Sequence, residues 1–272
     1  MSPEERIAAL PLWRGRPALE PVAAGRTNRN FIVRDEGRRH FARVGADIPI
    51  HGISRAAERR CAMLAARAGI APEVVFAEGD VMITAFAEGE ALSLTSGGAP
   101  DLLPRIAELL RRLHSIPAQE DLPAFCPVAA AQRYLARLSD AELPVPRRQI
   151  AACLALLPKL PAQCLVHGDL IPENLIRNGE RLLLVDWEYA GNGAAVTDVA
   201  MVISNFNLDH AAAQALLRLC GPVNHGALEA MRVAAIVREA LWCLAQAQIG
   251  GMAGDLPEYT DLCLERLQRV LP

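Results

Sequence analysis

The chain has 272 residues, 52% of them hydrophobic, which is enough to bury a substantial core in one large domain or two moderate lobes. A net charge of −3 and a pI near 6.1 give no electrostatic reason to expect nucleic acid or an anionic membrane surface as a partner. Seven cysteines without a Cys-x-x-Cys pair, and no apolar run long enough to cross a bilayer, predict a cytoplasmic protein without a disulfide framework or structural metal.

The first 87 residues predict a small α+β lobe that begins with a helix capped by Ser2. Strand patterns separated by Gly-containing turns occur at residues 19–22, 30–34, 38–44, 73–77 and 81–87. Ser54 is the expected N-cap of an amphipathic helix that continues to about residue 68. We therefore expect five antiparallel strands with this helix beside them.

Two segments of this lobe contain polar candidates for a binding site. Residues 23–29 form a small, polar stretch with Thr27 and Asn28, whose side chains and backbone amides suit a loop over phosphates. Taken alone, this stretch favours an ordinary hairpin loop. Glu58 lies in the expected helix, where it would reach a cation on the sheet, although an isolated glutamate there is better explained as a surface charge.

From Glu88 onward the pattern is mainly helical. Helices are expected at residues 101–114, 128–138, 147–157, 196–205, 209–220, 226–248 and 256–271. His114, at the end of the first of these, is expected to be a packed and hydrogen-bonded histidine. The extended stretch at residues 84–90 marks the lobe boundary, which gives an N-terminal lobe at 1–87 and a helical lobe at 88–272.

The central stretch, residues 165–198, places Asp169, Asn174 and Asp186 around a short hairpin in apolar surroundings. Such groups reduce stability unless an ion or substrate compensates them. Asn178-Gly179 is a strong two-residue turn signal. With Arg177 and Glu180 flanking that turn, the register would put Asp186 opposite Ile171, within the loop bounded by Asp169 and Asn174.

This convergence favours phosphoryl transfer. Carboxylate and amide oxygens from Asn174 and Asp186 suit Mg²⁺, which also takes phosphate oxygens, and Asp169 would accept a hydroxyl proton. Because Lys159 is the only lysine, a cationic phosphate anchor would have to be an arginine, backbone amides or a metal. A polar hairpin with Asx-turns is the alternative, and it explains each residue singly but not the whole spacing.

The motif His167-Gly168-Asp169-x₄-Asn174, with Asp186-Trp187-Glu188 twelve residues later, resembles the aminoglycoside phosphotransferase and choline/ethanolamine kinase superfamily. That superfamily is a branch of the protein-kinase-like fold. The resemblance implies a two-lobed α+β architecture and a reaction that uses ATP and Mg²⁺.

The resemblance also implies roles for residues of the first lobe. Gly25-Arg26-Thr27-Asn28 resembles the loop that covers the nucleotide, Arg43 the phosphate-anchoring cation, and Glu58 its helix partner. The run Ile83-Thr84-Ala85-Phe86 resembles the hinge whose backbone holds adenine, and it includes the site candidates Ile83 and Ala85. Asp198 resembles a residue that braces the catalytic loop, and a plain helix N-cap explains it equally well.

Arg43, in place of a lysine, resembles the choline kinase side of the superfamily, and the Asp-Trp-Glu-Tyr run at residues 186–189 resembles the choline and thiamine kinase groups more than the aminoglycoside enzymes. The acceptor candidates are Glu188, Tyr189, Asn205 and Trp242. Trp242 resembles one tryptophan of a cage for quaternary ammonium, held by cation–π contacts. Ala245 stands where a second tryptophan is often found, and Asn205 stands where a cage glutamate is expected. Core packing is the alternative for Trp187, Tyr189 and Trp242.

Together these observations predict an ATP- and Mg²⁺-dependent kinase that phosphorylates the hydroxyl of a small molecule, such as choline, ethanolamine or a similar amino alcohol. The alternatives within this class are a thiamine kinase and an aminoglycoside-type antibiotic phosphotransferase. A regulatory pseudokinase that binds nucleotide is the alternative from another class. The oligomeric state stays open.

Overall fold

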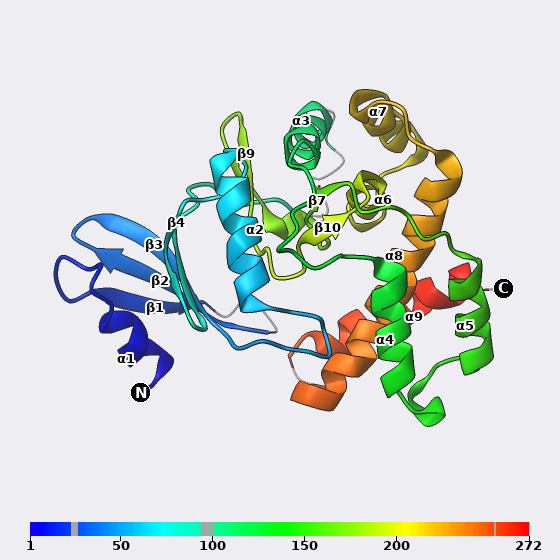
Figure 1. Ribbon diagram of the computed structural model, residues 1–272, viewed down its shortest axis with the longest axis horizontal. Helices are drawn as coiled ribbons and strands as arrows, with labels where there is room; N and C mark the ends of the chain where they lie inside the picture. Colours follow the sequence, from blue (N-terminus) through cyan, green and yellow to red (C-terminus); the bar gives the residue numbers. More distant parts are fainter. Residues whose placement is uncertain (23–26, 94–98, 100, 253, 272) are drawn as a thin grey trace.

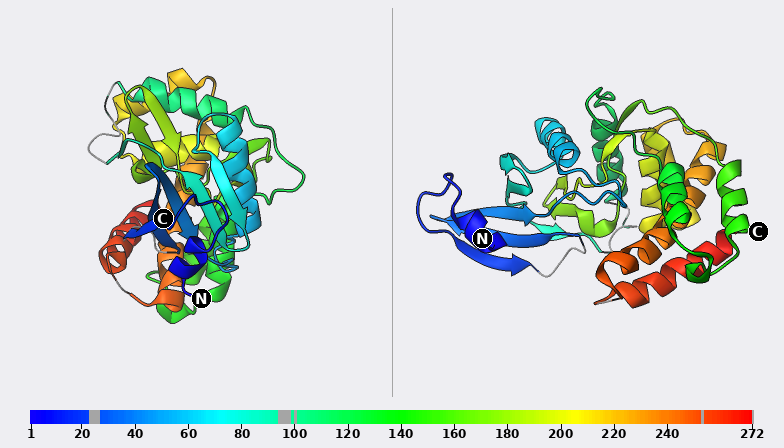
Figure 2. Two further views of the ribbon diagram at one scale, coloured as in Figure 1. Left: turned by 90° about the vertical axis from the view of Figure 1, so that its left-hand side faces the viewer. Right: turned by 60° about the horizontal axis from the view of Figure 1, so that its bottom comes forward.

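The structure is a computed structural model that describes residues 1–22, 27–93, 99, 101–252 and 254–271. It consists of a small N-terminal sheet and a larger, mainly helical part that lie side by side (Figures 1 and 2). The expected α+β architecture, with a five-stranded antiparallel sheet preceding a helical part, is confirmed. The exact boundary between residues 87 and 88 stays a prediction.

The N-terminal part is a meander of five strands after a short helix. Its elements are α1 (Pro3–Ala8), β1 (Ala18–Val22), β2 (Arg29–Asp35), β3 (Arg38–Val44), β4 (Val74–Glu78) and β5 (Val81–Ala85), in the sheet order β1-β2-β3-β5-β4. The capping box of Ser2 and Glu5 starts α1. Between β2 and β3, Glu36 and Gly37 both have positive φ, as a tight hairpin turn of the primed type requires.

Helix α2 (Arg55–Arg67) connects the two parts. Ser54 Oγ accepts a hydrogen bond from the N–H of Ala57, as expected for its N-cap. The sheet has its own small core, which includes Phe31 and Ile83. The buried alanines and Cys61 of α2 belong instead to the large core of the helical part. The helix is therefore held against the second lobe although it precedes β4 in the chain.

The helical part contains the expected helices at nearly the expected positions. They are α3 (Leu103–His114), α4 (Pro127–Arg137), α5 (Arg147–Leu156), α6 (Ala195–Asn205), α7 (His210–Cys220), α8 (His225–Gly250) and α9 (Leu256–Val270), with 3₁₀ turns η1 (Asp140–Glu142) and η2 (Pro172–Asn174). Helix α8 packs against α4, α6 and α9. Among the described residues, no helix combines the length and apolar character that a membrane span requires.

Short strands on the inner side of the helical part carry the central stretch. They are β6 (Glu90–Ala91), β7 (Cys164–Val166), β8 (Leu175–Asn178), β9 (Arg181–Leu184) and β10 (Gly191–Gly193), with β7 paired to β10 and β8 placed between β6 and β9. The hairpin register differs from the expected one. Asn178 pairs with Arg181, so the turn residues are Gly179 and Glu180. The pairing is shifted by two residues, and because side chains alternate with a period of two, the facing of each strand is unchanged.

Candidate active site

A buried carboxylate fixes the loop that carries Asp169. Asp198, in the first turn of α6, is fully buried and accepts hydrogen bonds from the backbone N–H groups of His167 (3.0 Å) and Gly168 (3.1 Å). His114 Nε2 lies 2.9 Å from the same carboxylate, so the expectation of a hydrogen-bonded histidine is confirmed. The N-cap of α6 is Ala194, which rules out the alternative role for Asp198.

The hairpin brings Asn174 against the backbone of Asp169. Asn174 is buried, and its Nδ2 donates a hydrogen bond of 2.9 Å to the carbonyl of Asp169. The carbonyl of Asn174 accepts from the N–H of Val185, which ties the loop to the start of the segment that leads to Asp186. Because Asn174 uses its nitrogen in this contact, its Oδ1 is the atom suited to a metal ion.

Asp186 adopts a left-handed backbone with φ of +64°. This conformation costs free energy for a residue other than glycine and is concentrated at functional sites. Desolvation by the surrounding protein and the nearby carboxylates of Glu188 and Glu58 raise the pKa of Asp186 well above its ordinary value, although the residue keeps solvent access. A divalent cation relieves such crowding of negative charge, so Asp186 and Asn174 fit the expected Mg²⁺.

The metal site would be incomplete without the nucleotide. Among the described residues, no three His, Cys, Asp or Glu side chains form a cluster that holds a metal by itself. Mg²⁺ commonly binds through one or two carboxylates together with substrate phosphates and water. The donor set agrees with that mode of binding.

The protein environment raises the pKa of Asp169. Desolvation raises its pKa to about 6, against the opposing effect of the Arg238 guanidinium, whose Nη1 lies 3.6 Å from Asp169 Oδ1. Glu239 and Glu188 act in the same direction as desolvation. A carboxyl with this pKa is ionised at neutral pH and takes up a proton more readily than an ordinary aspartate.

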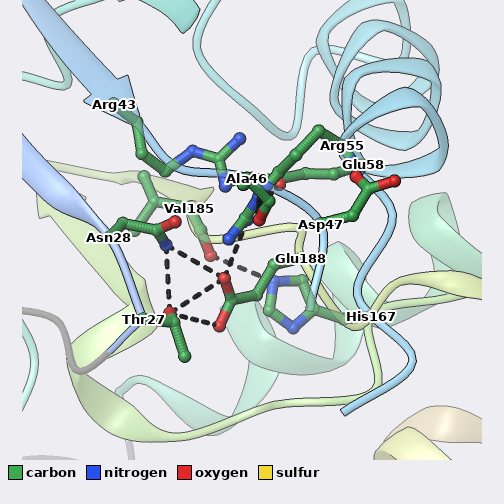
Figure 3. A network of polar contacts seen from close by, with 10 residues as sticks. All are labelled: Thr27, Asn28, Arg43, Ala46, Asp47, Arg55, Glu58, His167, Val185 and Glu188. Atoms are coloured by element: carbon green, nitrogen blue, oxygen red, sulfur yellow. Dashed lines mark hydrogen bonds and ion pairs between the residues drawn. The ribbon is translucent and has the colours of Figure 1, made fainter. Parts of the chain in front are cut away.

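A buried ionic network joins residues of the first lobe to Glu188, which follows the hairpin (Figure 3). Arg43 on β3 forms an ion pair with Glu58 of α2, and both side chains are buried. The second Glu58 oxygen lies 2.8 Å from Nη1 of Arg55, which also lies 3.0 Å from Glu188 Oε2. Glu58 is therefore not the surface charge that its sequence context alone would favour.

The loop before β2 contacts the same network through Glu188. Thr27 Oγ1 lies 2.9 and 3.0 Å from the two Glu188 oxygens, and Asn28 Nδ2 donates to Oε2 at 2.9 Å. Glu188 thus holds the described end of the predicted nucleotide-covering loop against the central hairpin (Figure 3). Gly25 and Arg26, which belong to the same prediction, lie outside the described residues.

The predicted hinge residues lie in and after β5. Ile83 is fully buried in the sheet core, so its side chain has a packing role. The N–H of Ala85 donates to the carbonyl of Glu73, and that of Phe86 to the carbonyl of Arg39. Because these donors are used by the sheet, an N–H contact to a nucleotide base would have to come from a residue after Phe86.

The four residues predicted to bind the acceptor molecule make different kinds of contact in the structure. Glu188 faces Thr27, Asn28 and Arg55, and no described contact places it in an aromatic cage. Asn205 donates to the carbonyl of Leu170 at 2.9 Å, so its amide holds the catalytic loop.

The aromatic residues considered for the acceptor site also differ in their contacts. Trp242 Nε1 donates to the Tyr189 hydroxyl at 2.7 Å, so these two rings do come together. Trp187 is buried, stacks edge-on against His167 and donates to the Leu184 carbonyl, which is the core-packing alternative.

Two arginines that the sequence did not single out are central to the site. Arg55, the first residue of α2, bridges Glu58 and Glu188 and donates to the Ala46 carbonyl. Arg238 of α8 donates to the Gly168 carbonyl at 3.2 Å and pairs with Asp169. Neither role could be predicted from the sequence, because the chain contains many arginines and no neighbouring motif distinguishes a single arginine within a helical pattern.

The fold and the site together define a two-lobed phosphotransferase, and comparison with known proteins supports this class. Residues 18–232 match the model of the phosphotransferase enzyme family, and the chain belongs to that family. The predicted superfamily is therefore confirmed.

Individual relatives agree with this membership. Over 100 residues the chain is 32% identical to protein LicA of Haemophilus influenzae, a match that spans 33% of this chain and 38% of that relative. A choline/ethanolamine kinase family protein from Mesorhizobium loti superposes with a TM-score of 0.76 at 25% identity, over 98% of this chain and 92% of the other. The choline kinase LicA from Streptococcus pneumoniae gives a TM-score of 0.79 at 20% identity, over 98% and 97%.

Proposed function

We propose that the protein is an ATP- and Mg²⁺-dependent kinase that transfers the γ-phosphoryl group to the hydroxyl of a small-molecule alcohol. The observation that carries this proposal is the contact of Asn174 with the Asp169 backbone, on a loop braced by Asp198 and followed by the strained Asp186. Choline, ethanolamine or a similar amino alcohol is the acceptor class that the similar proteins suggest.

In this proposal Asp169 orients the acceptor hydroxyl and takes its proton. The hydroxyl oxygen forms a bond to the γ-phosphorus while the bond from that phosphorus to the oxygen of the departing ADP breaks. Asn174 and Asp186 hold Mg²⁺, which when bound neutralises charge on the phosphate oxygens. The pKa of Asp169, near 6, keeps it ionised before transfer at neutral pH.

The first lobe supplies the contacts to the nucleotide. Arg43 binds phosphate oxygens while Glu58 holds its guanidinium in place, a geometry for which the planar arginine fork is suited. Thr27 and Asn28 close over the phosphates, and the strand end at Ala85 borders the adenine, with Ile83 supporting that strand from the sheet core. The Arg43–Glu58 ion pair supports this arrangement.

An acceptor screen with ADP release and phosphorylated product as readouts tests the proposal. We expect turnover that requires both Mg²⁺ and an alcohol from the amino alcohol class. Phosphorylation of thiamine or an aminoglycoside, and of no amino alcohol, would move the protein to the alternative acceptor classes. Binding of Mg²⁺ and ATP without transfer to any acceptor would identify a pseudokinase and reject the proposed reaction.

A further inference from the structure

A pocket lies against the catalytic loop on the side of α4 and α8. Its empty volume is about 400 Å³, counting the open mouth. Arg133 and Arg238 are its two arginines, and none of its lining residues is an aspartate or glutamate. Phe125 and Tyr189 form part of its wall. The pocket is therefore positively charged at its lining, next to the residue proposed as the base.

Arg238 lines this pocket and keeps a donor atom without a partner. Its hydrogen bond to the Gly168 carbonyl and its ion pair with Asp169 both use Nη1. Its Nε is buried and has no hydrogen-bond partner among the described residues, and the whole side chain is only 7% exposed. A buried donor without a partner is costly, and a carboxylate that accepts from Nε and Nη2 together would satisfy it.

The aromatic rings of the pocket already contact a cation of the protein itself, the guanidinium of Arg238. The guanidinium carbon of Arg238 lies 4.5 Å from the ring centre of Tyr189 and 5.4 Å from that of Phe125. A quaternary ammonium needs such faces for itself, and here it would meet a like charge. The Tyr189 ring, predicted as part of a cage, is thus occupied by a side chain of the protein.

The other ionisable groups of the pocket also favour a negatively charged ligand. Asp169 offsets the charge of Arg238, whereas Arg133 forms no ion pair with any residue in the described part of the chain. His51 is held between Tyr134 and Gln246, and burial lowers its pKa, so it is neutral near pH 7 and adds no charge. Arg133 is therefore the lining residue whose charge is not offset by an ion pair within the described part of the chain, whereas Glu188 and Glu239 act on His51 and Arg238 from outside the lining.

We infer that the pocket binds a carboxylate of the acceptor, so that the phosphorylated alcohol is a hydroxy acid or a hydroxy amino acid. The carboxylate contacts the guanidinium groups of Arg238 and Arg133, and the hydroxyl faces Asp169. The hydroxyl oxygen bonds to the γ-phosphorus of ATP, its proton passes to Asp169, and ADP leaves. This inference rests on the proposed kinase reaction, and it replaces the amino alcohol that the similar proteins suggest with an alcohol that carries a carboxylate.

Matched pairs of alcohols that differ by one carboxylate-bearing group test it. They are ethanolamine and serine, choline and carnitine, and ethylene glycol and glycerate. Binding of each is measured by calorimetry to the whole protein with Mg²⁺ and a non-hydrolysable ATP analogue, and transfer is measured with ATP. We expect the acid to be favoured by about 10- to 100-fold in at least one pair, as a charge-assisted contact implies.

Two variants of the pocket and one control test whether a preference for the acid depends on these arginines. Arg133→Gln should lower the ratio of acid to parent alcohol by about 3- to 10-fold, because its charge is exposed. Arg238→Gln should lower the ratio further, and the ratio within one variant is insensitive to general damage. Arg137→Gln, an exposed arginine one turn along α4, should leave the ratio unchanged.

The outcomes separate this inference from the proposed function. Equal or weaker binding of the acid in all three pairs, or no binding of any of them, overturns the inference. Phosphorylation of ethanolamine or choline without an advantage for the acids also overturns it and leaves the kinase reaction standing. Tight binding of an acid without phosphorylated product supports the pocket and rejects the proposed reaction.

Discussion

Replacing Asp198 with alanine should destabilise the protein and disable the catalytic loop together. The side chain is fully buried and accepts from the N–H groups of His167 and Gly168 and from His114. Each buried donor left without a partner costs about 1–3 kcal/mol, so we expect a loss of about 3–5 kcal/mol in the free energy of unfolding. For a chain of this size that corresponds to a fall in Tm of roughly 8–15 °C.

Urea and thermal unfolding, followed by circular dichroism, measure this effect. Asp209→Ala is the matched control, because Asp209 also accepts a backbone N–H, that of Ala212, but at an exposed helix start. Its loss should cost only about 1 kcal/mol. A cost below about 1 kcal/mol for Asp198→Ala, or one equal to that of the control, would refute the assignment of Asp198 as the brace of the loop.

Two further predictions concern the same loop. Gly168 has φ of +76°, and an added Cβ would lie 2.8 Å from the Tyr189 carbonyl oxygen, so Gly168→Ala should lose more than about tenfold in turnover. Gly179 has a similar φ of +58° but lies in open space, so Gly179→Ala should cost about 1–3 kcal/mol of stability without loss of turnover. Comparable turnover in both variants would contradict this prediction. Because desolvation raises the pKa of Asp169 to about 6, kcat/KM should rise with pH through that value as the base loses its proton. Arg238→Gln removes a charge that lowers this pKa and should shift the acid limb upward, and a profile that is flat between about pH 5 and 7 would exclude Asp169 as the base.

The sequence predicted those parts of the site that depend on local spacing. Asp169, Asn174 and Asp186 belong to one hairpin, where turn length and strand alternation determine which groups meet, and the structure brings Asn174 to Asp169 as expected. The turn was placed one residue too early, which shifts the pairing of the two strands by two residues. The Asn178-Gly179 signal puts both residues in the turn, whereas in the structure Asn178 pairs with Arg181.

The contributions of distant helices were not predictable in the same way. Arg238 follows Gly168 by 70 residues, and nothing in the local pattern of α8 distinguishes it from the other arginines of the chain. Glu188 is predicted to contact the acceptor from its place in a motif, and its contacts in the structure are with Arg55, Thr27 and Asn28, which come from distant parts of the chain. Such pairings are decided by how the two lobes pack.

The central claim, that Asp169 is the base of a phosphoryl transfer to an alcohol, is tested most directly by comparing the wild-type protein with Asp169→Asn. Product formation from ATP and the acceptor found in the screen is measured together with the affinity for ATP in the presence of Mg²⁺. We predict that turnover falls by about 10²- to 10⁴-fold while nucleotide affinity and the fold are retained. Turnover close to that of the wild type would contradict the account.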